Sequence, residues 1–217
     1  MSKTTLAVLG ILGGLLCAIA DLFLDLKGTD NQKLGSKEII DSKWADMPHY
    51  RFVVSTILAF FAVPMYSCGV LALGDIFSAH SAIFSKFFIT ISFVGAMSGF
   101  MIHTFLNLCP TMYRIVLKNA SFELAEKLIN STFRQIYFPF IAGYSMLVII
   151  SSGMIIFAIL SGLVTAPLWC ICLNPVVFQI VGLLLRATGL KCFIDAPGCC
   201  AASLGLASYG VLALIIK

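Results

Sequence analysis

The sequence predicts an all-α, polytopic membrane protein, a six-transmembrane-helix bundle that forms a single domain over residues 1–217. Composition is the first evidence, because 60% of the residues are hydrophobic and only 11% are charged, whereas soluble domains contain about 25% charged residues. Length is the second, because a helix needs about 20 mainly apolar residues to cross the hydrocarbon core. Six stretches satisfy this requirement: residues 5–24, 52–74, 87–108, 136–160, 164–185 and 196–216.

The first stretch, 5–24, is predicted to be a membrane helix and not a cleaved signal. It is long, it contains Asp21, and no small-x-small cleavage site precedes Lys27. Gly10 and Gly14 form a G-x-x-x-G pair, the spacing that lets two membrane helices approach closely. This stretch should therefore pack inside the bundle.

Acidic residues continue the face that the two glycines begin. Cys17, Asp21 and Asp25 follow Gly14 at steps of three, four and four residues, so all of them share one side of the helix. A carboxylate is costly in the membrane, and such residues usually face the bundle interior and mark functional sites. Asp21 is therefore expected to point inward. Asp25, nearer the interface, is either part of the same site or a simple loop acid.

The stretch 87–108 repeats this design. Gly95 and Gly99 form a second G-x-x-x-G pair, and His103 and Asn107 follow at four-residue steps. Two crossings separate this helix from the first, so their C-terminal ends should lie at the same side of the membrane. Asp21 and His103 are thus expected to meet, together with at least one of Arg51 and Arg186.

These considerations give a set of six candidate ligand-binding residues at one leaflet. Structural roles are open alternatives: the arginines can snorkel to the interface, and an Asp21–Arg51 or Asp21–His103 pair can simply fix helix register. The set is Asp21, Asp25, Arg51, His103, Asn107 and Arg186.

Basic residues predict the orientation of the chain. The first, third and fifth loops contain eleven Lys and Arg residues, and the other side contains three: Lys3, Lys86 and Lys217. Because the Lys- and Arg-rich side is normally cytoplasmic, we expect a multi-pass protein of the cell membrane with both termini outside. The net charge of +4 then follows from topology, and no nucleic-acid partner is expected.

The third loop has an amphipathic pattern over residues 122–131. Ser121 can cap a helix that begins at Phe122, and Phe122, Ala125, Leu128 and Ile129 fall on its apolar face. The pattern predicts an interfacial surface helix; a plain connector fits it equally well. Asn174 and Pro175, by contrast, fall in the middle of the stretch 164–185, where proline is expected to kink the helix.

Two short motifs connect the chain with a known group of proteins. DLFLDLKG closes the first stretch and HYRF opens the second. The pattern resembles a family of small bacterial six-transmembrane-helix proteins of unknown function. The resemblance implies the architecture and no established activity.

Three functional hypotheses follow. The first is a polar pocket at the cytoplasmic leaflet that binds, senses or transports an amphipathic small molecule or a membrane lipid. The second is a membrane-embedded lipid-modifying enzyme, with Asp21 and His103 as its acid–base pair. The third is a structural polar network without a ligand. The eight cysteines and three histidines show no zinc-like spacing, so neither a metal site nor a cofactor is predicted.

Overall fold

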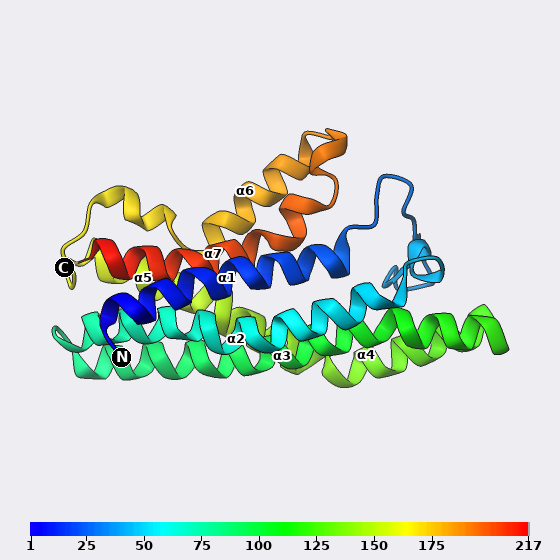
Figure 1. The fold of residues 1–217 in the computed structure, drawn as a ribbon, viewed down its shortest axis with the longest axis horizontal. Helices are drawn as coiled ribbons and strands as arrows, with labels where there is room; N and C mark the ends of the chain where they lie inside the picture. The colour runs from blue at the N-terminus through cyan, green and yellow to red at the C-terminus, as the bar shows by residue number, and fades with distance from the viewer. Residues whose placement is uncertain (217) are drawn as a thin grey trace.

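Five helices in the computed structural model, which describes residues 1–216, are long and apolar enough to cross a membrane (Figure 1). The chain is thus an all-α polytopic membrane protein. The third and fourth of these helices are longer than the sequence predicts and extend past the others at one end (Figure 1). The five are α1 (Lys3–Asp25), α2 (His49–Ser78), α3 (Ala82–Asn119), the continuous helix Phe122–Leu160, and α7 (Ala196–Ile215).

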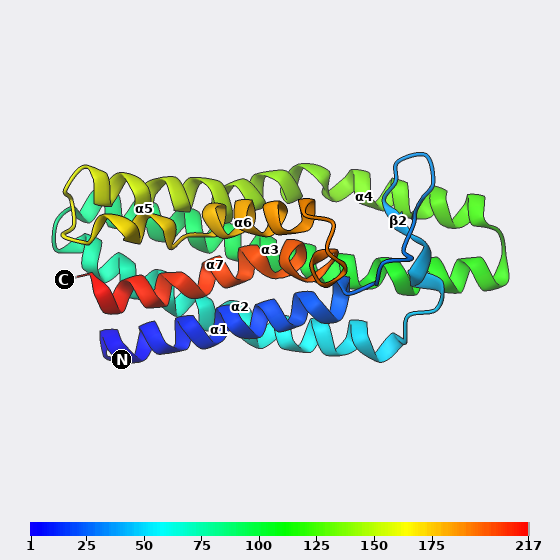
Figure 2. The same cartoon turned by 90° about the horizontal axis from the view of Figure 1, so that it is seen from above.

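The continuous helix has three parts. It begins as α4 (Phe122–Tyr144), widens into a π-helical segment, η2 (Ser145–Ile150), and ends as α5 (Ser151–Leu160). Figure 2 shows α4 and α5 along one side of the molecule and α1 along the other, with α7 between them.

The predicted fifth membrane helix, 164–185, is wrong in its first half. That half contains a short 3₁₀ turn, η3 (Leu168–Cys172), and the helix α6 covers only Pro175–Ala187. Asn174 is the reason, because its side-chain oxygen accepts the Val177 N–H at 3.1 Å and so caps a new helix. Pro175, expected in a helix interior, occupies the first helical position, where it is well tolerated.

Small residues hold α1 between α2 and α7. A Cβ atom added to Gly10 would lie 2.5 Å from the Gly69 Cα, and Gly69 in turn approaches the Gly210 backbone. Gly14 lies equally close to the Ala207 backbone. Three helices therefore approach at backbone distance, as the G-x-x-x-G spacing predicts.

The α3–α4 hairpin extends beyond the end of α1, and the α1–α2 loop packs on it (Figure 1). This loop contains a two-stranded antiparallel ribbon, β1 (Lys33–Leu34) with β2 (Ile40–Asp41), and a 3₁₀ turn, η1 (Ser42–Ala45). Ile40 and Trp44 are buried there against Tyr113, Ala125 and Ile129.

The predicted surface helix, 122–131, is accordingly the first part of α4. Ser121 caps it as expected, since its hydroxyl accepts the Leu124 N–H at 3.3 Å. Its apolar face packs on the loop and on α3 through Ala125 and Ile129. Leu128, predicted on the same face, is exposed instead.

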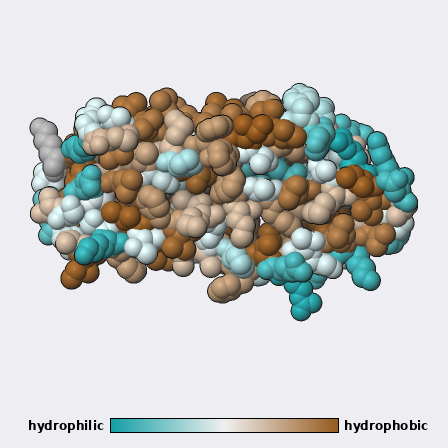
Figure 3. All heavy atoms as spheres, turned by 60° about the horizontal axis from the view of Figure 1, so that its bottom comes forward, coloured by the Kyte–Doolittle hydropathy of each residue, from teal (hydrophilic) through white to brown (hydrophobic). Residues whose placement is uncertain are grey.

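Both chain ends lie at the same end of the molecule (Figure 1). Lys217, one of the three basic residues predicted at that side, lies outside the described residues. Hydrophobic side chains gather in the middle of the surface and hydrophilic ones toward the two ends (Figure 3). This distribution is typical of a membrane-spanning bundle.

A last connection, η4 (Lys191–Phe193), joins α6 to α7. The two helices pack closely: a Cβ atom added to Gly182 of α6 would lie 2.8 Å from the Ala201 side chain of α7. The α6–α7 pair thus forms a hairpin beside α1 (Figure 1).

Candidate functional site

A carboxylate lies where three helices meet, near the end of α1. Asp21 continues the face of α1 on which Gly10 and Gly14 pack, so its side chain turns toward the bundle interior. Ser203 of α7 donates a hydrogen bond to Asp21 Oδ2 at 2.5 Å. His103 of α3 places its Nδ1 3.4 Å from Asp21 Oδ1. The structure thus brings Asp21 and His103 together, as the helix spacings predict.

Ser55 of α2 links α1 to His103. Its hydroxyl oxygen lies 2.8 Å from the Ala20 carbonyl oxygen and 2.8 Å from His103 Nε2, and it has one hydrogen to donate. If Ser55 donates to Ala20, His103 Nε2 donates to Ser55, and a further proton is needed between His103 Nδ1 and Asp21. If Ser55 donates to His103, the neutral imidazole donates from Nδ1 to ionised Asp21. The same arrangement of heavy atoms therefore fits two states that differ by one proton.

Asn107, one turn beyond His103, extends this network. Its Nδ2 donates to Ser55 Oγ at 3.2 Å and to the His103 carbonyl oxygen at 3.0 Å. Its Oδ1 is buried without a partner in the described part of the chain. Asn107 thus helps to fix the position of His103 through Ser55 and the His103 carbonyl, and it does not line the cavity described below.

The expectation that an arginine joins Asp21 is wrong. Arg51 donates to three carbonyl oxygens at the end of α1: Leu22 at 3.3 Å, Phe23 at 3.1 Å and Leu26 at 2.7 Å. They belong to the last turn of α1, where carbonyl oxygens run out of helical N–H partners, so a guanidinium is a suitable cap; the Leu22 carbonyl also accepts the Leu26 N–H at 3.1 Å. Arg51 therefore fixes the end of α1 and takes no part in the Asp21 network.

A cavity of about 230 Å³ opens beside Asp21 and His103. It lies between the α1–α7 side of the bundle and the α3–α4 side, and most of its lining is apolar. Its volume is slightly below the roughly 300–1,000 Å³ typical of ligand pockets, so it has room for a small molecule or the end of one hydrocarbon chain. Two thiols, Cys17 and Cys199, line it, and its polar residues are Asp21, Asp25, Tyr66, His103, Tyr144 and Ser203.

Three of these polar residues are ones that sequence analysis does not single out. Tyr66 is buried and its hydroxyl has no hydrogen-bond partner within residues 1–216. Ser203 lies in a stretch of small apolar residues, one turn after Cys199. A lone hydroxyl residue in such a stretch is the sequence signal that could have identified it. Tyr144 is partly exposed at the edge of the cavity.

The π-helical segment forms part of the cavity wall. Leu147 and Val148 belong to it and line the cavity. Gly95 is pressed against it, since an added Cβ would lie 2.7 Å from the Leu147 amide nitrogen. One turn further on, Gly99 lines the cavity, where an added Cβ would make only ordinary contacts, 3.5 Å from Leu147 Cδ2 and 3.7 Å from the Tyr66 hydroxyl. Wide turns of this kind are rare in helices and frequent at functional sites.

A second pocket, of about 240 Å³, adjoins the cavity on the side of the loop and is strongly charged. Lys27 contacts Asp25 at 2.5 Å and Asp41 at 2.9 Å, and Lys33 contacts Asp41 at 2.9 Å. Asp25 and Cys199 line both pockets, whereas Arg186 lines only the charged one. The predicted set of six is therefore divided among several environments.

Ion pairs determine the pKa values of Asp41 and Lys27 in the charged pocket. Burial alone would raise the pKa of the Asp41 carboxyl, but Lys27, Lys33 and the Asn31 amide hold that pKa below its usual value. Burial alone would lower the pKa of Lys27, but Asp25 and Asp41 raise it overall. These groups are charged at neutral pH and fasten the loop to α1.

Metal binding finds no support among the described residues. Within residues 1–216, no three His, Cys, Asp or Glu side chains lie together in a way that could hold a metal ion. The groups at the cavity that can form hydrogen bonds or exchange protons are Asp21, His103 and neighbouring hydroxyls.

Comparison with known proteins places the whole chain in one family. The model of a family of unknown function, DUF6796, matches residues 1–217, so the chain belongs to that family. Neither the curated proteins nor the solved structures contain a match to the chain.

Proposed function

We propose that this member of the DUF6796 family binds an amphipathic small molecule or a lipid chain in the cavity beside Asp21. The apolar part of the ligand would lie among the cavity side chains, and its polar group would bond to Asp21, His103 and Ser203. The observation that supports this is a buried carboxylate–imidazole pair on the wall of an otherwise apolar cavity. Burying such a pair is costly, and ionisable groups inside a membrane-spanning bundle usually mark a functional site.

The test is whether a compound co-purifies with the protein and depends on Asp21. Asp21→Asn keeps the side-chain shape and a partner for Ser203 but removes the charge. We expect this variant to unfold at nearly the wild-type temperature and to retain about tenfold less of the compound, since a hydrogen bond to a charged group contributes about 1.5–3 kcal/mol. Mass spectrometry of organic extracts measures the difference.

Asp25→Asn is the matched control, because Asp25 lies at the edge of the cavity and is already paired with Lys27. It should retain the compound. Equal retention by Asp21→Asn and wild type would contradict the proposal, as would the absence of any retained compound from protein purified out of native membranes. Binding is the step that sensing and transport share.

Acid–base catalysis on a lipid is a second candidate, favoured by one observation. The Asp21–His103–Ser55 arrangement fits two states that differ by one proton, which is what a group that gives and takes protons requires. Chemical change in the co-purified compound on incubation with wild type, and its absence with His103→Gln, would support the enzyme over the binding protein.

The orientation of the chain is part of the same proposal. With the loops rich in Lys and Arg in the cytoplasm, the α3–α4 hairpin is cytoplasmic and both termini are outside. Lys3→Cys should then react with a membrane-impermeant maleimide on intact cells, and Asn119→Cys at the tip of the hairpin should not. The reverse pattern would invert the topology.

A further inference from the structure

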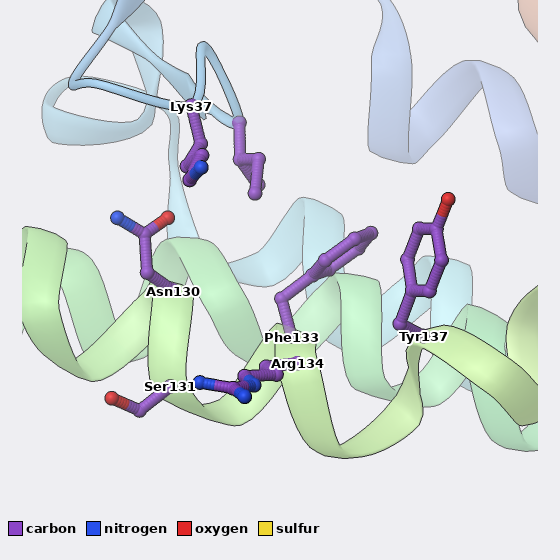
Figure 4. A pocket seen from close by; sticks show the side chains of 7 residues that line it. Lys37, Asn130, Ser131, Phe133, Arg134 and Tyr137 are labelled. Carbon is purple, nitrogen blue, oxygen red and sulfur yellow. The ribbon is translucent and has the colours of Figure 1, made fainter.

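Besides the cavity and the charged pocket, a groove of about 710 Å³ lies between the α1–α2 loop and α4 (Figure 4). Lys37 and Ile39 contribute from the loop. Figure 4 shows the Lys37 side chain directed toward Asn130 and the rings of Phe133 and Tyr137 projecting from α4 on the side of the loop. Arg134 lies along the flank of α4 beside Ser131 (Figure 4). The groove therefore combines two cations with two aromatic rings.

The charge of this groove is not neutralised by the protein. Neither Lys37 nor Arg134 forms an ion pair within residues 1–216, and no carboxylate lines the groove. Glu126, one turn before Asn130 on α4, is engaged with Ser36, whose N–H it accepts at 2.5 Å and whose hydroxyl it accepts at 2.7 Å; it also accepts one N–H of the Asn130 amide at 3.5 Å, which leaves the other N–H of Asn130 for a ligand. The groove thus favours an anion.

Aromatic rings continue from the groove down one face of α4. Phe133 lies 6.3 Å from Tyr137 and 6.0 Å from Phe140, and Phe140 lies 6.5 Å from Tyr144 in a stacked arrangement (ring centroids). Phe140 and Tyr144 line the cavity. A continuous apolar track, the α4 aromatic ladder, therefore joins the basic groove to the edge of the cavity.

The position of the groove along α4 matches the edge of the hydrocarbon layer. The uninterrupted apolar part of the continuous helix begins close to Tyr137, and Phe138 and Ile141 on its outer side are exposed. Lys37 and Arg134 come just before this point. Basic and aromatic residues at this level are in reach of lipid headgroups.

We infer that this groove binds an anionic phospholipid. The phosphate of the headgroup lies between Lys37 and Arg134, with Asn130 as a further donor, and one acyl chain follows the α4 aromatic ladder toward the cavity. Charge complementarity and the ladder both favour a lipid over a free anion, because a free phosphate has no use for the apolar track. The site does not depend on the proposed function, since the groove has its own lining and Asp21 is not part of it.

Lipid binding to the full-length protein in detergent tests the inference. Dioleoyl-phosphatidylglycerol and dioleoyl-phosphatidylcholine are titrated in turn, and native mass spectrometry counts the bound lipid. Wild type should prefer phosphatidylglycerol, and about 0.5 M salt should weaken that preference by screening. The double variant Lys37→Gln, Arg134→Gln should bind phosphatidylglycerol about 25-fold more weakly, at about fivefold per charge.

The matched control is Lys118→Gln, Lys127→Gln, which removes two exposed charges from the same hairpin outside the groove. It should bind phosphatidylglycerol like wild type. Equal effects of the two double variants would overturn the inference and reduce the groove to general surface charge. Equal binding of the two lipids would also overturn it, and so would displacement of phosphatidylglycerol by millimolar inorganic phosphate. Asp21→Asn separates the two proposals, because it should leave phosphatidylglycerol binding unchanged.

Discussion

The first and third helices contain the same G-x-x-x-G spacing and use it differently. In α1, Gly10 and Gly14 are both closed against the backbones of α2 and α7. In α3, Gly95 is closed against Leu147, whereas Gly99 opens on the cavity. The same motif thus gives two close backbone contacts in α1. In α3 it gives one close contact, at Gly95, and one glycine, Gly99, that lines the cavity. The motif predicts close approach, but the neighbouring helix decides whether the space is filled.

The largest expected effect on stability comes from disrupting the close packing of α1 against α7. Gly14→Leu places a side chain where the Ala207 backbone already lies, so α1 and α7 must separate. Overpacking typically costs about 1–3 kcal/mol and more when the backbone must move; we expect a loss of at least that size, read as a lower unfolding temperature in detergent. Gly153→Leu is the control, because nothing lies within 4 Å of its added Cβ. Equal unfolding temperatures for the two variants would refute the packing of α1 described above.

A smaller effect should separate the two glycines of α3. Gly95→Ala presses a methyl group against the Leu147 backbone and should destabilise the protein by about 1–3 kcal/mol. Gly99→Ala meets only ordinary contacts and should be neutral or slightly stabilising, since alanine is favoured over glycine in helices by about 1 kcal/mol. Thermal unfolding of the pair measures the difference directly. If both changes were equally harmful, the hollow beside Gly99 would be absent.

The smallest expected effect is on the α1–α2 loop, which packs on the α3–α4 hairpin. Asp41 has a lowered pKa, so the stability it gives the loop is full above the ordinary carboxyl pKa of about 4 and is lost as pH falls through the lower folded value. Proteolysis of the loop in detergent should therefore be slow at pH 7 and accelerate below about pH 4, with an acid-stable protease as the probe. Asp41→Asn should be cut faster at pH 7 and show a weaker pH dependence.

Asp30→Asn is the control for that measurement. Asp30 pairs with Lys43 at the exposed surface of the same loop, and exposed pairs contribute little. Its loss should leave the cleavage rate nearly unchanged. Similar acceleration by both variants would mean that the loop is not fastened through Asp41.

Much of this architecture could be predicted from apolar length and small-residue spacing. Those signals located the long helices, turned Asp21 inward and brought it to the level of His103. They failed where a local bond outweighs composition. Residues 164–173 are as apolar as a membrane helix, yet Asn174 starts a new helix by capping it. Hydropathy reports that a segment avoids water, and it does not report the backbone conformation.

The candidate site was harder to predict for a related reason. An arginine and an aspartate expected at the same depth in the membrane suggest an ion pair, but Arg51 instead donates to three carbonyl oxygens at the end of α1. Only the fold shows which acceptor is nearer. Tyr66 and Ser203 were missed because one hydroxyl in an apolar helix has no periodic pattern to reveal it. The groove at Lys37 and Arg134 joins segments whose contact no spacing rule predicts.

The π-helical segment also restricts which insertions and deletions the gene can tolerate. A π turn contains one residue more than the α-helical turn it replaces, so a one-residue deletion within Ser145–Ile150 can restore a regular helix that leaves α5 facing the same way, whereas a one-residue deletion in α4 that leaves the π turn in place would rotate everything beyond it by about 100°. Ser151, whose hydroxyl lies 2.6 Å from that of Tyr209, would then face away from α7. Ser152, which accepts the Val176 N–H at 3.3 Å, would leave α6. The length of α4 should therefore be held fixed by selection, and a one-residue deletion should be tolerated only within the π-helical segment.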